Sequence, residues 1–322
     1  MILFIKIFII TISFLLSYLI FNFSKNLFNK YLLDKPNERS SHLISKPRGG
    51  GIVFILIFFV FSIINIFINS FKFSSILPFF FLPLIITSFM DDFYSISIKY
   101  RICSQLFTSS ILIVNYLLRL NQEFMIINLL LFLLFLFCSV SVINFINFLD
   151  GIDGLIAGSF LTILVVLSLN YNLDFGLLSL IGGLMAFLIF NWEPSKIFMG
   201  DVGSTFLGAI FLSIVFNQES IIDSLSIGLI FIPLFFDAIF TLIRRIKNKQ
   251  NIFSPHKLHL YQRLNQSGIS HSNVSLIYII SIGILSISYV FGQIIHLITA
   301  SIVVILVGLY LDRFVAIKFD KY

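Results

Sequence analysis

Long apolar runs separated by shorter polar segments make up almost the whole chain. Eleven runs are long enough, or nearly long enough, to cross a bilayer as helices, at about residues 2–23, 51–70, 75–90, 102–119, 124–146, 155–171, 175–191, 204–217, 224–243, 273–291 and 293–311. A spanning helix needs roughly 20 apolar residues, and several of these runs are shorter. The pattern predicts an all-α, polytopic transmembrane protein with about 10–11 transmembrane helices.

The first run fits either a signal peptide or a transmembrane helix. No small-residue cleavage pattern follows it, so we expect a transmembrane helix. The sequence also shows no internal repeat of the kind found in inverted-repeat transporters. We therefore expect residues 1–322 to form a single integral membrane domain.

Composition supports a membrane protein and adds two expectations about packing. The chain is 58% hydrophobic and 11% charged, and its mean hydropathy is +1.05. Its 41 phenylalanines are expected mainly to face lipid. Cys103 and Cys138 lack CxxC spacing, so we expect them to be small hydrophobic residues in the core.

The positive charges predict a topology. The net charge is +6, and most of the 21 Lys and Arg residues lie in the segments 24–50, 91–101, 192–203, 244–272 and the tail from 312. The positive-inside rule places these segments in the cytoplasm, with the N-terminus outside and the C-terminus cytoplasmic. The same charge pattern gives no reason to expect a nucleic-acid partner.

Two adjacent carboxylates, Asp91 and Asp92, follow an apolar run in SFMDDFYSISIKYR. Neighbouring carboxylates repel one another unless a cation, a substrate hydroxyl or a shared proton relieves them. Acidic groups at membrane depth are rare, which favours a functional site. The alternative is a solvated helix end with Lys99 and Arg101 as counter-ions.

The stretch NFINFLDGIDGL, residues 144–155, places Asn144, Asn147, Asp150 and Asp153 at intervals of three. On a helix this spacing gathers side chains near one face. Their oxygens suit Mg²⁺ that is shared with substrate phosphates. The alternative is a helix cap, in which Asp150 or Asp153 accepts backbone N–H groups.

A third acidic motif, NWEPSKIFMGDVGSTFLG, places Asp201 between two glycines just before an expected helix. Backbone N–H groups of such a turn can face an anion while the carboxylate faces a metal. GDVGS alone is a weak signal. Two other acidic motifs on the same predicted side strengthen it.

The longest basic segment contains His256, His259 and Arg263 within SPHKLHLYQRL. Two histidines beside an arginine suit diphosphate binding. Zinc is the competing ligand, although both cysteines are far away in the sequence. The upstream stretch 244–249 fits anionic lipid headgroups at least as well as catalysis.

Two further polar features have open interpretations. Arg39 and His42 lie in DKPNERSSHLISKPRGGG, which either faces a phosphate or serves as a positive-inside signal. Asp237 precedes the basic segment and is expected to pair structurally with a neighbouring cation.

Together these motifs resemble a known family. DKPNxRxxH, DDxxxIxxKxR, NxxNFLDGIDGL, NWxPxxIFMGDVGS and a late FSPxxxH occur in this order between Asp34 and about Leu264. The set is similar to the polyprenyl-phosphate N-acetylhexosamine-1-phosphate transferases of glycosyltransferase family 4. This resemblance implies an active site on the cytoplasmic face of the bacterial inner membrane.

The implied reaction transfers an N-acetylhexosamine 1-phosphate from a UDP-sugar to undecaprenyl phosphate and releases UMP. The implied cofactor is Mg²⁺, with Mn²⁺ as a substitute. By motif, Asn147 and Asp201 would be metal ligands, and Asp91, Asp92 and Asp150 would be catalytic. The expected substrate-binding residues are Lys99, Arg101, Asn144, Asp153, His256, His259, Arg263, Arg39 and His42. The bilayer is a further partner, and a homodimer is one assembly to consider.

The sequence departs from the family pattern at two places. Ser95 stands where a third Asp or Asn is common, and Leu260, Tyr261 and Gln262 follow His259 where HxHH is common. The second form resembles the O-antigen-initiating subgroup that uses UDP-N-acetylfucosamine or UDP-N-acetylquinovosamine, so the sugar is not assigned to N-acetylglucosamine.

Two questions stay open at the level of sequence. Direct attack by the lipid phosphate and a covalent aspartyl intermediate both fit the motifs. A transporter or lipid carrier with a polar cytoplasmic vestibule is the alternative function, and it would have little need for Mg²⁺.

Overall fold

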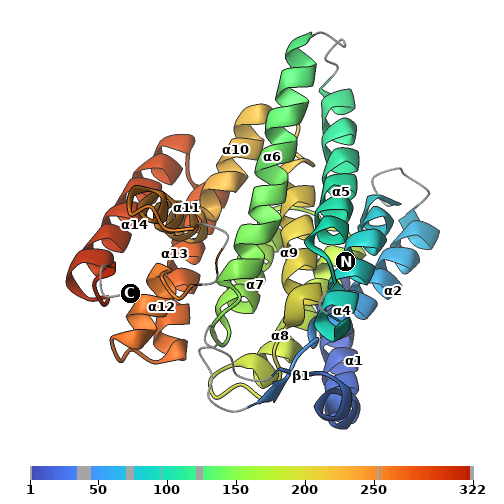
Figure 1. The fold of residues 1–322 in the computed structure, drawn as a ribbon. Coiled ribbons are helices and arrows are strands. Elements are labelled where there is room, and N and C mark those ends of the chain that lie inside the picture. The colour runs from blue at the N-terminus through green and yellow to red at the C-terminus, as the bar shows by residue number, and fades with distance from the viewer. Residues whose placement is uncertain are drawn as a thin grey trace.

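The computed structural model describes residues 2–34, 45–69, 76–94, 96–120, 126–251, 254 and 256–319. The described chain is almost entirely helical (Figure 1). Its elements are α1 (Ile2–Tyr31), β1 (Leu33–Asp34), β2 (Lys46–Pro47), α2 (Gly51–Asn69), the 3-10 helix η1 (Leu77–Phe81), α4 (Leu82–Tyr94), α5 (Ile98–Arg119), α6 (Ile126–Leu149), α7 (Leu155–Asn170), α8 (Phe175–Asn191), α9 (Gly200–Val215), α10 (Ile221–Ile230), α11 (Ile232–Lys247), α12 (Leu260–Gln266), α13 (His271–Phe291) and α14 (Ile294–Phe314). β1 and β2 form a short antiparallel pair.

The all-α, polytopic prediction is confirmed, with a lower count of full-length spans. Within the described ranges, seven helices are long and apolar enough to cross a membrane, or eight if the bent pair α10 and α11 forms one span. The apolar helices α7, α8 and α9 have 16, 17 and 16 residues and are shorter than a full span. They account for the difference from the expected ten or eleven.

These three short helices form the centre of the bundle. Each is apolar around most of its circumference, which is typical of a helix surrounded by other helices. α8 packs against α1 and α2, α7 against α13, and α9 against α4 and α6. Other helices therefore cover the central layer, so its members need not match the full thickness of the bilayer.

The core corrects two expectations about side chains. Phenylalanine does more than face lipid, because at least nine phenylalanines of the described residues are almost fully buried: Phe21, Phe54, Phe58, Phe81, Phe160, Phe187, Phe206, Phe211 and Phe231. Cys103 and Cys138 are both exposed, so the core placement was wrong. An apolar sequence alone does not distinguish a lipid-facing side of a helix from a protein-facing one.

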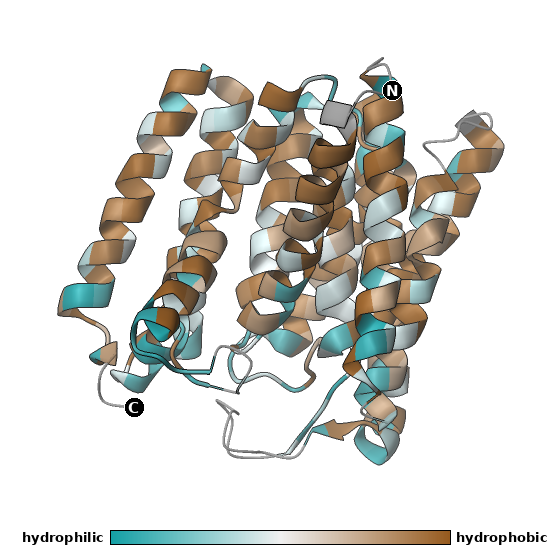
Figure 2. Cartoon of the chain, turned by 45° about the horizontal axis from the view of Figure 1, so that its top comes forward, coloured by the Kyte–Doolittle hydropathy of each residue, from teal (hydrophilic) through white to brown (hydrophobic). Residues whose placement is uncertain are grey.

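Polar residues gather at one end of the bundle, the lower end in Figure 2. The segments predicted to share one side contact each other there. The Lys46 ammonium donates to Ser195 Oγ at 2.9 Å, and Arg263 donates to the carbonyl of Ile317 at 2.8 Å. The termini lie at opposite ends of the bundle (Figure 2), in keeping with the predicted topology.

Candidate active site

Three helix ends meet at the polar end of the bundle and bring four acidic residues together. Asp91 and Asp92 lie near the end of α4, Asp150 follows α6, and Asp201 lies in the first turn of α9. We call these four residues the carboxylate cluster.

Asp92 holds the start of α9. Its two carboxylate oxygens accept the backbone N–H groups of Asp201 and Val202 at 3.1 and 3.2 Å. These are amides of the first helical turn, which has no partners within its own helix. Gly200 has φ +78°, and a Cβ there would lie 2.7 Å from Asp92 Oδ2. The glycine therefore permits the approach of α4 to α9.

Asp91 lies between a cation and another acid. Its Oδ2 accepts from Arg101 Nη1 at 2.6 Å, and its carboxyl group is within hydrogen-bonding reach of Asp201. Two carboxyl groups so close require a shared proton or a cation. The solvated-end alternative accounts for the Arg101 pair but not for the contact with Asp201.

Asn147 joins the cluster, and Asn144 does not. Asn147 Nδ2 donates to Asp201 Oδ1 at 3.0 Å and to Ser204 Oγ at 2.9 Å. Asn144 instead exchanges hydrogen bonds with Gln105 of α5, at 2.9 and 3.3 Å. The spacing of three residues thus points the two amides at different helices.

Asp150 is the least neutralised acid of the cluster. It is half-buried, and no hydrogen bond to its carboxylate is found among the residues that the structure describes. Burial raises the pKa of Asp150 to about 8, and the negative charges of Asp201, Asp92 and Asp153 add to the effect. A bound divalent cation would lower that pKa, because it stabilises the ionised form.

Asp153, three residues further on, is a buried structural anchor. Its carboxylate accepts from the backbone and the hydroxyl of Ser195 at 3.1 and 2.8 Å, and Lys46 Nζ lies 3.9 Å away. Burial opposes ionisation, but His271, Ser195 and Lys46 together lower the pKa of Asp153 below its ordinary value. The capping alternative is wrong for α7, whose N-cap is Gly154 without a side-chain bond.

The donor set near Asp201 fits a hard cation. Within the described ranges, no group of three or more His, Cys, Asp and Glu residues forms a metal site. Mg²⁺ does not require one, since one or two protein oxygens, water and substrate phosphates usually complete its shell. Asp201 supplies a carboxylate, and Asn147 uses its nitrogen for both hydrogen bonds, which leaves the amide oxygen for a ligand. The zinc alternative gains no support.

Residues 256–261, which we call the histidine segment, are organised by Asp237, and the Tyr261 hydroxyl joins this segment to the carbonyl of Phe148 near Asp150. This buried carboxylate of α11 accepts the backbone N–H groups of Leu260 and Tyr261 at 2.7 and 3.1 Å, and it lies 3.4 Å from His259 Nδ1. The expected structural pairing of Asp237 is therefore seen with His259. The ring centroid of His256 is 4.9 Å from that of His259.

His256 is held in its neutral form. Burial lowers the pKa of His256 to about 3, and the charges of His259 and Arg245 add to this effect. A neutral imidazole still offers one hydrogen-bond donor to a phosphate. His256 can therefore contact a diphosphate without neutralising its charge.

Arg263 is placed away from the carboxylate cluster and is fully buried. Its guanidinium donates to the carbonyls of Leu258 and Ile317 at 3.1 and 2.8 Å and also to Asp312. Arg244 binds the same Asp312 at 2.8 Å. This arrangement gives Arg263 a structural role in place of the expected substrate contact.

Three predicted site residues remain, which are Lys99, Arg39 and His42. Lys99 is exposed near Arg101, at the start of α5. Arg39, His42 and Ser95 lie outside the described residues. Ser195, Ser204 and Asp312 were not predicted as site residues from the sequence. Asp312 had one available signal, because it is an acidic residue near the end of an otherwise apolar run.

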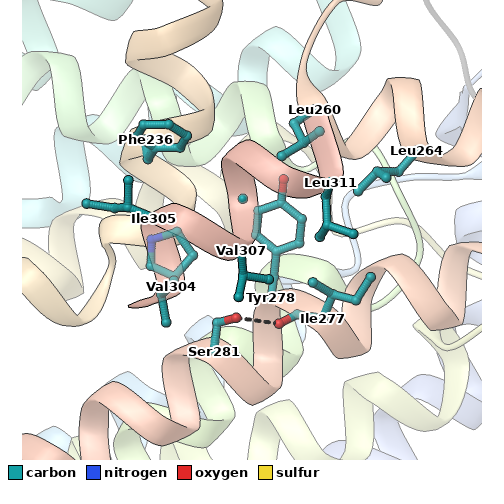
Figure 3. Close-up of a pocket in the computed structure, with 12 residues that line it drawn as sticks. Phe236, Leu260, Leu264, Ile277, Tyr278, Ser281, Val304, Ile305, Val307 and Leu311 are labelled. Carbon is teal, nitrogen blue, oxygen red and sulfur yellow. Dashed lines mark hydrogen bonds between the residues drawn. The ribbon is translucent and has the colours of Figure 1, made fainter. Parts of the chain in front are cut away.

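A separate apolar groove with an empty volume of about 420 Å³ lies between α11, α12, α13 and α14 (Figure 3). Its lining includes Phe236, Leu264, Tyr278 and Val307. The groove meets the polar site at Tyr278, whose hydroxyl donates to Asp237 at 2.8 Å.

Comparison with known proteins agrees with this geometry. Residues 74–218 match the family described as Glycosyl transferase family 4. Over 110 residues the chain is 40% identical to a probable undecaprenyl-phosphate N-acetylglucosaminyl 1-phosphate transferase of Bacillus subtilis (strain 168), covering 32% of this chain and 30% of the relative. Over 123 residues it is 31% identical to a decaprenyl-phosphate N-acetylglucosaminephosphotransferase of Mycobacterium leprae (strain TN), covering 33% and 31%.

A third relative carries a different name. The chain is 33% identical over 101 residues to a phospho-N-acetylmuramoyl-pentapeptide-transferase of Carboxydothermus hydrogenoformans, covering 31% of this chain and 30% of the relative. The chain thus matches about 30% of the length of each of these three relatives.

The fold and the carboxylate cluster define a multi-pass membrane protein with an acidic site at one end of its helix bundle. More particularly, residues 74–218 match the family described as glycosyl transferase family 4. This segment contains Asp91, Asp92, Asn147, Asp150 and Asp201, so the whole carboxylate cluster lies within the family region.

Proposed function

We propose that this chain is an enzyme that transfers an N-acetylhexosamine 1-phosphate from a UDP-sugar to undecaprenyl phosphate. The products are the lipid-diphosphate-linked sugar and UMP. The observation that carries the proposal is the convergence of Asp91, Asp92, Asp150 and Asp201 with Asn147 inside the family segment. The names of the relatives support a polyprenyl phosphate and an amino sugar phosphate as the reactants.

Asp201 and Asn147 would hold Mg²⁺, with Mn²⁺ as a substitute. When bound, the cation would neutralise charge on the donor diphosphate and on the leaving UMP. Asp92 fixes the start of α9 and thereby fixes Asp201. The Asn147 hydrogen bond restrains the Asp201 carboxylate from the side of α6.

The lipid phosphate would attack beside Asp91 and Asp150. A phosphate monoester has a second pKa of about 6, so it is largely dianionic at neutral pH and has little need of a base. Asp91 can accept a residual proton or orient the nucleophile. Lys99 and Arg101 lie on the same side and would balance its charge. His256 and His259 would donate hydrogen bonds to the donor diphosphate.

A covalent aspartyl intermediate is the rival route, and isotope exchange separates the two. Exchange of labelled UMP into the UDP-sugar without lipid acceptor is expected only for the covalent route. Exchange would argue for the covalent route, and a lack of exchange would count against it.

We place the carboxylate cluster at the cytoplasmic face of a bacterial inner membrane, because the basic segments lie at the same end of the bundle. The sugar remains to be chosen among N-acetylglucosamine, N-acetylfucosamine and N-acetylquinovosamine. The residues after His259 favour an O-antigen-initiating role. The relatives named for N-acetylglucosamine favour the first sugar.

The test is UMP release by the purified chain in detergent or vesicles, with a panel of UDP-N-acetyl sugars. UMP release should require the UDP-sugar, undecaprenyl phosphate and Mg²⁺ together. Transport of an intact solute without UMP release would instead support the carrier alternative. Loss of release when any one component is omitted is the expected result.

A further inference from the structure

Tyr261 links two segments that are far apart in the sequence. It lies in the first turn of α12 and is 1% exposed. Its hydroxyl donates to the carbonyl of Phe148 at 3.1 Å, across 113 residues of sequence. That carbonyl is in the last turn of α6, where backbone oxygens have no partner within the helix. Tyr261 therefore completes the end of α6.

Gly151 makes room for this contact. A Cβ at Gly151 would overlap the Tyr261 hydroxyl oxygen and lie 3.0 Å from Cζ of the same ring. Gly151 follows Asp150 directly, so the tyrosine packs against the turn that carries this acid. The turn needs a residue without a side chain there because the Tyr261 side chain occupies that space.

The other side of Tyr261 contacts the histidine segment. Its ring stacks on His259, with centroids 5.8 Å apart and planes 18° apart. Its backbone N–H is bound by Asp237, which also lies 3.4 Å from His259. The Tyr261 side chain thus lies between His259 and the Phe148–Gly151 turn.

The hydroxyl stays a hydrogen-bond donor. Burial raises the pKa of Tyr261 well above its ordinary value, and the negative charges of Asp237 and Asp150 raise it further. The hydroxyl therefore stays protonated at neutral pH and can donate to the Phe148 carbonyl.

We infer that Tyr261 is a positioning residue that fixes the histidine segment relative to the turn carrying Asp150. The inference rests on the proposed function. In the reaction, His256 and His259 would meet the donor diphosphate while Asp150 lies near the metal site. Transfer requires both segments to hold one relative position, and a displacement of about 1 Å can cost up to about a hundredfold in rate.

The test is a double-mutant cycle on Gly151→Ala and Tyr261→Phe. Tyr261→Phe removes the hydroxyl and should lower kcat about tenfold with little change in KM, since it alters position and removes no substrate contact. Gly151→Ala should lower kcat further through the clash. The double variant should recover part of the Gly151→Ala loss, because phenylalanine lacks the overlapping oxygen. The apparent melting temperature should behave in the same way, with the double variant recovering part of the decrease caused by Gly151→Ala.

Two matched controls separate this effect from general damage. Tyr289→Phe removes a hydroxyl that pairs with Tyr171 at 3.4 Å, and it should leave kcat unchanged. Gly228→Ala adds a methyl group where no atom lies within 4 Å of the new Cβ. It should also leave kcat unchanged.

Each outcome decides a separate question. Additive effects of the two substitutions on both kcat and melting temperature would overturn the contact and the inference. Coupled melting temperatures with unchanged kcat in Tyr261→Phe would overturn the positioning role. If the wild-type protein releases no UMP but the melting temperatures of the variants are coupled, the proposed function is refuted while the contact itself stands.

Discussion

The carboxylate cluster and the arginine cluster of Arg244, Arg263 and Asp312 differ in charge balance, because the first gathers like charges and the second pairs opposite charges. In the carboxylate cluster, acids adjoin acids, and Asp150 has no hydrogen-bond partner for its carboxylate among the described residues. In the arginine cluster, two guanidiniums share one carboxylate, and the aromatic ring of Phe319 lies against both. Unbalanced like charges mark a place for a ligand, whereas balanced opposite charges hold helices together.

Asp201→Asn should have the largest effect on activity. The substitution keeps the shape but removes the negative charge that would hold the cation, so kcat should fall about a thousandfold. UMP release by the purified variant measures this. The matched control is Asp174→Asn, because Asp174 caps α8 at the other end of the bundle and asparagine caps equally well. Equal activity of Asp201→Asn and wild type would refute the metal assignment.

Asp312→Asn should have the largest effect on stability. It leaves the buried Arg263 without its counter-ion, which typically costs about 3–5 kcal/mol. The apparent melting temperature in detergent should fall, while kcat per folded molecule should stay near the wild-type value. Asp223→Asn is the control, since Asp223 is hydrogen-bonded to Ser220 at an exposed helix start. If Asp312→Asn lowered kcat without changing the melting temperature, the structural role of the arginine cluster would be contradicted.

His256→Gln should have a smaller effect, which is a change in how stability depends on pH. The pKa of His256 in the folded chain is about 3, below its ordinary value of 6.5. The unfolded chain therefore binds more protons between these values, and stability falls as the pH drops from 6.5 towards 3. His256→Gln should make that decline shallower. Parallel declines in wild type and His256→Gln would contradict a neutral His256.

The sequence predicted the helical, polytopic fold and the shared side of the polar motifs, because both follow from hydropathy and charge along the chain. It could not separate Asp150 from Asp153. The two acids are three residues apart in one motif, yet only Asp153 meets Ser195. Arg263 likewise looked like a phosphate ligand until its partners Ile317 and Asp312 were seen. In each case the role depends on a partner 42 or more residues away.

The number of full-length spans could not be predicted for a related reason. Hydropathy measures how apolar a segment is and says nothing of what surrounds it. α7, α8 and α9 are apolar because they lie at the centre of the bundle, and they need not match the bilayer thickness because other helices surround them. The buried phenylalanines show the same ambiguity, since lipid and protein core both favour apolar rings.

The central claim is that the carboxylate cluster binds a divalent cation through Asp201. Mn²⁺ binding followed by electron paramagnetic resonance tests this directly, without substrate and without turnover. Wild type and Asp174→Asn should each bind one Mn²⁺ that Mg²⁺ displaces, and Asp201→Asn should lose this binding while it stays folded. Undiminished Mn²⁺ binding by Asp201→Asn would contradict the account.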